Sequence, residues 1–128
     1  MSRLTCNKEL LEYELFSSQT GLIAFSTTRK GGCSKGAYAT FNCSPYSGDD
    51  SAAVLQNLQH LGTLLPTFPV DWVIPHQVHG TSVLDVGQEY ADASQDTRRE
   101  MLEGVDALVT DRPGYCICVS TADCIPLL

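Results

Sequence analysis

The sequence predicts a compact protein of mixed α and β structure, and three observations lead to this fold class. Runs of apolar and β-branched residues with the length of buried strands recur along the chain. One stretch instead repeats its apolar residues every three or four positions, which is typical of an amphipathic helix. A chain of 128 residues that is 43% hydrophobic can bury one core and is too short for two independent domains.

The strands are predicted from apolar runs bounded by turn residues. Residues 10–16 favour either a short strand or a turn of helix. Further strands are predicted at 22–27, 70–74, 81–86, 105–110 and 115–120. The first of these five is expected to be largely buried.

Two helices are predicted. One of about four turns follows the N-capping side chains of Asp49, Asp50 and Ser51. Its apolar face is formed by Val54, Leu55, Leu58, Leu61 and Leu65. His60 lies away from this face, so we predict it to be a solvated surface residue. A short helix is expected around 96–102, within a polar interval.

The charge of the chain excludes some classes of protein. A net charge of -7 and an isoelectric point near 4.7 argue against a protein that binds nucleic acid or an acidic membrane surface. Charges interrupt the first residues, and no apolar span is long enough to cross a membrane. We therefore predict a cytoplasmic protein. Its six cysteines are then expected to be reduced, and Cys116 and Cys118 should point to the same side of a strand.

A glycine-rich stretch follows the strand predicted at 22–27. It contains three glycines, Gly31, Gly32 and Gly36, which give the backbone conformational freedom. The cationic Arg29 and Lys30 lie beside them in sequence, and exposed N–H groups next to cationic side chains suit an anion or a small polar ligand. It is not a P-loop, because the Gly-Lys-Ser/Thr ending is missing. The pattern is also compatible with a simple turn.

Two of the three histidines, His76 and His79, lie at a bend between two predicted strands, and Asp123 and Cys124 follow the last predicted strand. Imidazole and thiolate together allow two chemistries. They can bind a divalent metal such as zinc, whose catalytic sites need about three protein ligands. Alternatively, a histidine can deprotonate Cys124 for nucleophilic attack, as in Cys-His hydrolases. A third reading makes Cys124 only a buried thiol.

Five segments taken in order closely resemble the laccase-domain family, long described as multicopper polyphenol oxidases and now regarded as purine nucleoside phosphorylases with adenosine deaminase activity. They are 25–34 (FSTTRKGGCS), 48–50 (GDD), 77–80 (QVHG), 106–111 (DALVTD) and 121–124 (TADC). QVHG and TADC are the specific parts. The resemblance runs from about residue 22 to the last residue.

The resemblance implies an α+β fold with layered mixed β-sheets flanked by helices. Family members are about twice as long, so residues 1–128 resemble a single laccase-domain unit truncated at its C-terminus, with an incomplete fold. By matched position it also implies a zinc site with His79 and Cys124 as ligands. The family's third ligand belongs to a His-Ala-Gly-Trp-Arg-Gly motif downstream of TADC, which this chain lacks.

The implied activity is that of a purine nucleoside phosphorylase acting on a purine nucleoside and phosphate, with adenosine deamination as a second reaction. Arg29 and the N–H groups of Gly31 and Gly32 are candidates for the phosphate or ribose side. Asp123 is a candidate for proton transfer or for orienting a ligand, and Asn42 for hydrogen bonding to substrate. Zinc is preferred to copper, because three histidines cannot furnish a multicopper centre.

Other functions stay open on the sequence. These are a Cys-His hydrolase using Cys124, a polyphenol oxidase, and an inactive fragment. The apolar end 125–128 looks like the first residues of a strand or helix whose remainder is missing. An apolar end of this kind is expected to be covered by another segment or chain. Self-association through this edge is one way to cover it.

Overall fold

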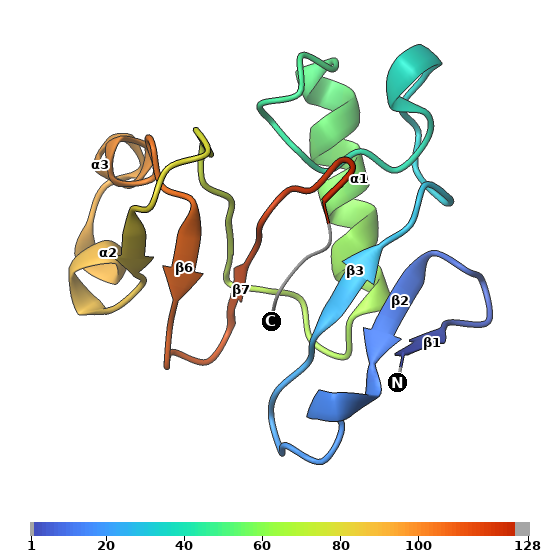
Figure 1. Cartoon of the computed structure of the whole chain (residues 1–128), viewed down its shortest axis with the longest axis horizontal. Coiled ribbons are helices and arrows are strands. Elements are labelled where there is room, and N and C mark those ends of the chain that lie inside the picture. The colour runs from blue at the N-terminus through green and yellow to red at the C-terminus, as the bar shows by residue number, and fades with distance from the viewer. Residues whose placement is uncertain (1, 125–128) are drawn as a thin grey trace. The chain divides into compact units, whose positions relative to one another are not determined.

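The computed structural model describes residues 2–124 and confirms the α+β fold class, with short strands and helices mixed along the chain (Figure 1). The chain divides into two compact units, Met1–Leu65 and Pro66–Leu128. Within the described residues, no helix is long and apolar enough to cross a membrane. Whether residues 1–128 act as one laccase-domain unit stays a prediction.

The first unit contains a three-stranded antiparallel sheet in the order β1-β2-β3, drawn in blue in Figure 1. The strands are β1 (Ser2–Leu4), β2 (Leu10–Tyr13) and β3 (Phe25–Thr27). A 3-10 turn, η1 (Glu14–Phe16), follows β2 directly. The two alternatives for residues 10–16 are therefore both present, one after the other.

The prediction of a largely buried strand at 22–27 is wrong in its first half. Leu22 and Ile23 are 50% and 51% exposed, and β3 begins only at Phe25. The cause is the length of the partner strand. β2 ends at Tyr13, whose N–H donates to the carbonyl of Ala24. Residues before Ala24 therefore have no partner in β2.

The long helix of the first unit is α1 (Ser51–Leu64). Asp50 is its N-cap, and the Asp50 side chain accepts a hydrogen bond from the N–H of Ala53, as predicted from the residue types. The predicted apolar face is only partly correct, since Leu55 is 58% exposed. Asn57, which is 1% exposed, takes a place on the buried face instead.

The second unit contains two parallel strand pairs, one nested in sequence inside the other. The outer pair is β4 (Asp71–Val73) with β7 (Tyr115–Ile117). The inner pair is β5 (Val83–Asp85) with β6 (Ala107–Val109). All four strands were predicted, each a few residues too long.

Two short helices join the strands of the inner pair. They are α2 (Gln88–Asp92), which the sequence did not indicate, and α3 (Gln95–Met101), which was predicted. Val73, Val86, Tyr90 and Leu102 form the buried core of this unit. Arg98 donates to the carbonyls of Tyr90 and Ala91 at 2.9 and 2.7 Å, which fixes α3 against α2.

Candidate functional site

The turn that carries His79 is held by one carboxylate. Asp106, just before β6, accepts hydrogen bonds from the N–H groups of Val78 and His79 on Oδ1, at 3.1 and 2.8 Å, and from Gly80 on Oδ2, at 2.8 Å. His79 is exposed and has a φ of +60°. This left-handed conformation is uncommon for a residue with a side chain, and such conformations cluster at functional sites.

A second tether joins the same turn to the segment that leads to Cys124. Gln77 accepts from the N–H of Ser120 on Oε1, at 2.7 Å, and donates from Nε2 to the carbonyl of Ser120, at 3.3 Å. The side-chain amide thus pairs with the backbone much as a neighbouring strand would. These two hydrogen bonds join QVHG to Ser120, the residue directly before TADC.

His79 and Cys124 offer the nitrogen and sulfur donors that zinc takes in proteins, and both side chains are exposed. Within residues 2–124, however, no three His, Cys, Asp or Glu side chains are arranged to hold a metal ion. The residues therefore fit zinc in donor type and fall short of it in number. Asp123 is exposed in the same segment.

His76 has a structural environment of its own. Its Nδ1 lies 2.7 Å from Oε1 of Glu103. Its N–H donates to the carbonyl of Leu102 and its carbonyl accepts from Gly104, at 3.0 Å each. These contacts anchor the start of the histidine turn to the end of α3.

Two of the three glycines of the predicted anion loop, Gly31 and Gly32, are closely packed, whereas Gly36 has open space around it. A Cβ on Gly31 would lie 1.8 Å from Oε1 of Glu9, and a Cβ on Gly32 would lie 2.2 Å from the carbonyl oxygen of Thr40. Arg29 donates from Nε and Nη2 to the carbonyl of Ala39, at 3.2 and 3.1 Å. Close packing and these hydrogen bonds therefore fix the conformation of the loop. The guanidinium of Arg29 keeps further N–H donors beyond the two used here.

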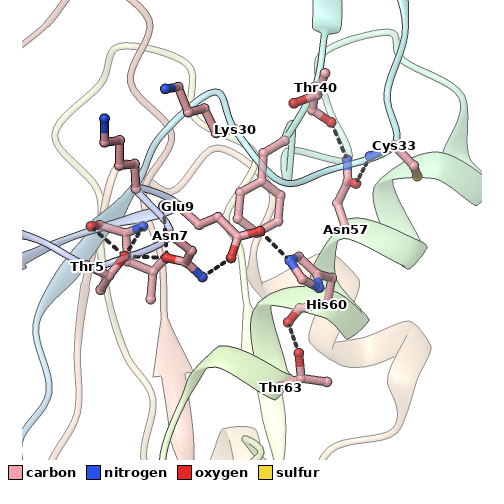
Figure 2. A network of polar contacts seen from close by, with 12 residues as sticks. Thr5, Asn7, Glu9, Lys30, Cys33, Thr40, Asn57, His60 and Thr63 are labelled. Atoms are coloured by element: carbon pink, nitrogen blue, oxygen red, sulfur yellow. Dashed lines mark hydrogen bonds and ion pairs between the residues drawn. The ribbon is translucent and has the colours of Figure 1, made fainter.

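The side chains beneath this loop form the network drawn in Figure 2. Glu9 is buried, lies with Oε1 2.7 Å from Nε2 of His60, and accepts from the side chain of Asn7. The His60 ring also lies 5.5 Å from that of Phe41. The prediction of a solvated His60 is only partly correct: its side chain is 38% exposed, but a carboxylate far away in sequence pairs with its ring.

Asn42 and Asn57 fix the chain that follows the loop. Asn57 accepts from the N–H of Cys33 at 2.9 Å and donates to the carbonyl of Asn42 at 2.7 Å. The Asn42 side chain donates to Asp49 at 3.2 Å, and Ser34 donates to the same carboxylate at 2.6 Å. The hydrogen bond from Ser34 is the main cause that lowers the pKa of Asp49.

Comparison with known proteins places these features in a family. Residues 23–128 match the family described as multi-copper polyphenol oxidoreductase laccase. The chain belongs to this laccase-domain family. The resemblance of its five segments is thereby confirmed.

Relatives within the laccase-domain family carry two kinds of name. A purine nucleoside phosphorylase of Bacteroides thetaiotaomicron is 50% identical over the whole chain, which covers 47% of that relative. Adenosine deaminase RL5, from an unknown prokaryotic organism, is 38% identical over 94% of the chain and 46% of its own length. The crystal structure of YlmD from Geobacillus stearothermophilus is 30% identical, with a TM-score of 0.78 over 96% of this chain and 45% of that one. The chain spans about half the length of the curated relatives it matches.

Two residues of the family segments have positions that sequence reasoning did not predict. Asp106 and Gln77 belong to DALVTD and QVHG, yet neither was assigned a role from its residue type. The signals in the sequence were a carboxylate near the start of the strand predicted at 105–110 and an amide two residues before a candidate ligand. Both hydrogen-bonding patterns depend on segments far apart in sequence.

Proposed function

We propose that this chain forms part of a purine nucleoside phosphorylase that also deaminates adenosine. The names of the relatives support both reactions. The structural observation that carries the proposal is the exposed His79, kept in a left-handed conformation by three hydrogen bonds to Asp106. A glycine would adopt this conformation at lower cost, so the imidazole has a use there other than folding.

The substrates would be a purine nucleoside and inorganic phosphate. We assign phosphate or ribose binding to Arg29 together with the N–H groups of Gly31 and Gly32, because guanidinium binds such oxygens bidentately. Asn42 is assigned to substrate and Asp123 to proton transfer. Asn42 is already hydrogen-bonded to Ser47 and Asp49, which would orient its amide.

We further propose that His79 and Cys124 are two ligands of one zinc ion. Nitrogen and sulfur donors favour zinc over the ions that prefer oxygen ligands, and three histidines are too few for a multicopper centre. Because the described residues supply no third ligand, we assign no reaction step to the metal.

The test measures bound metal and nucleoside turnover on the same preparations of the natural gene product. We expect about one zinc per chain that is retained on dialysis, and phosphate-dependent release of base from inosine or adenosine. His79→Ala and Cys124→Ser should lose both zinc and turnover. His76→Ala is the matched control and should keep zinc, because its imidazole is bound to Glu103. Zinc retained in both ligand variants would refute the site.

The same variants separate the other functions. A Cys-His hydrolase would be indicated if Cys124 of metal-free protein were alkylated stoichiometrically and Cys124→Ser lost activity without losing metal. Oxidation of phenols with bound copper would indicate a polyphenol oxidase. The apolar end 125–128, on which self-association was predicted, lies outside the described residues, and cytoplasmic location stays a prediction.

A further inference from the structure

Cys116 in β7 and Cys118, directly after the end of this strand, form a pair of thiols on one side of the extended chain. Their Sγ atoms lie 3.8 Å apart, and Sγ of Cys118 also lies 3.4 Å from the carbonyl oxygen of Cys116. Both side chains are half-buried. The alternation of side chains along an extended strand explains why residues two apart share this face.

The separation of the two sulfurs matches a metal chelate. Thiolates about 2.3 Å from a tetrahedral zinc ion lie about 3.8 Å from each other. A disulfide would require the sulfurs to approach to about 2.05 Å, which the extended backbone opposes. The existing geometry therefore suits chelation without rearrangement.

We propose that Cys116 and Cys118 form a two-thiolate site for a thiophilic divalent ion such as zinc or cadmium. Binding forms two metal–sulfur bonds and releases the two thiol protons to solvent, with no change of oxidation state. Two protein ligands leave further coordination positions to water or small thiols. The site would therefore hold an exchangeable ion.

The backbone around the pair is fixed by the outer strand pair. Trp72 of β4 is in register with Cys116 of β7, and the N–H of Cys118 donates to the carbonyl of Val73 at 2.9 Å. Residues in register on neighbouring strands project from the same face. Trp72, the only tryptophan of the chain, thus shares the face of the two thiols.

This pair is distinct from the donors His79 and Cys124. Among residues 2–124, no group of three potential ligands includes the pair together with either of those side chains. The inference does not depend on the proposed enzymatic activity, since it concerns only the thiols of Cys116 and Cys118.

The experiment titrates the full chain, free of metal and reduced, with cadmium. We expect ultraviolet thiolate-to-cadmium charge transfer and a change in Trp72 fluorescence that saturate together. Cys116→Ser and Cys118→Ser should each weaken this binding at least about tenfold, since each removes one of two ligands. Cys6→Ser, at an exposed cysteine with no assigned role, is the matched control and should bind as the unchanged chain does.

Two results would overturn the site. One is cadmium binding that Cys124→Ser abolishes, and the other is binding that survives in both variants of the pair. A second measurement uses the chain without substitutions, so its result does not depend on whether the variants fold. Phenylarsine oxide condenses with two thiols to form two arsenic–sulfur bonds and one water, and its adduct should map to the peptide that holds residues 116–118. An adduct confined to other cysteines would also refute the proposal.

Discussion

Replacing Asp106 with asparagine tests whether the carboxylate determines the conformation of the His79 turn. Asparagine keeps the size of the side chain but has one acceptor oxygen and no charge. Three N–H groups now donate to the two carboxylate oxygens, at 3.1, 2.8 and 2.8 Å. The variant would lose the Gly80 bond on Oδ2, and the other two bonds would become neutral.

Hydrogen bonds to charged groups contribute about 1.5–3 kcal/mol and neutral ones about 0.5–1.5 kcal/mol. Because the turn is exposed, water replaces part of this loss, and we expect the free energy of unfolding to fall by about 2 kcal/mol. Urea unfolding followed by the fluorescence of Trp72 measures this change. Asp111→Asn, an exposed aspartate after β6, is the control and should change stability by less than about 0.5 kcal/mol. Equal stability of the two variants would refute the role of Asp106.

Three further predictions follow from local geometry. His79→Gly should unfold at a higher urea concentration than His79→Ala, because glycine adopts a φ of +60° without strain. Gly32→Ala should lose about 3 kcal/mol of stability in urea, since its Cβ meets backbone, while Gly36→Ala, in open space, should lose about 1 kcal/mol. The hydrogen bond from Cys118 lowers the pKa of Cys116, whereas burial raises that of Cys43 to about 12. Alkylation followed by mass spectrometry should therefore persist to lower pH at Cys116, because the thiolate is the reactive form.

Elements with local signals were predictable from the sequence. Helix α1 begins where Asp50 caps it and ends before Pro66, and both signals are neighbours of the helix. Strand β1 was not predicted. The other strands were found in the right places but were too long, because a partner strand decides where pairing stops. Leu22 and Ile23 illustrate this, being apolar and yet exposed beyond the end of β2.

Residues whose environment comes from distant segments were not predictable in the same way. His60 pairs with Glu9 across 51 positions, so its place on the helix could not reveal the partner. His79 was preferred to His76 as the partner of Cys124 only through the family resemblance. The tertiary structure determines the position of the Asp106 carboxylate at the turn, and local sequence patterns carry no information about it.

The nesting of the two parallel strand pairs has a consequence for the order of folding. Pairing of β5 with β6 closes the shorter loop and brings Asp106 to the His79 turn. It also roughly halves the length of free chain that β4 and β7 must still bring together. Kinetically, the histidine turn should be complete before the outer pair closes and Gln77 captures Ser120. The cysteine segment would then arrive last, at a turn already in its final conformation.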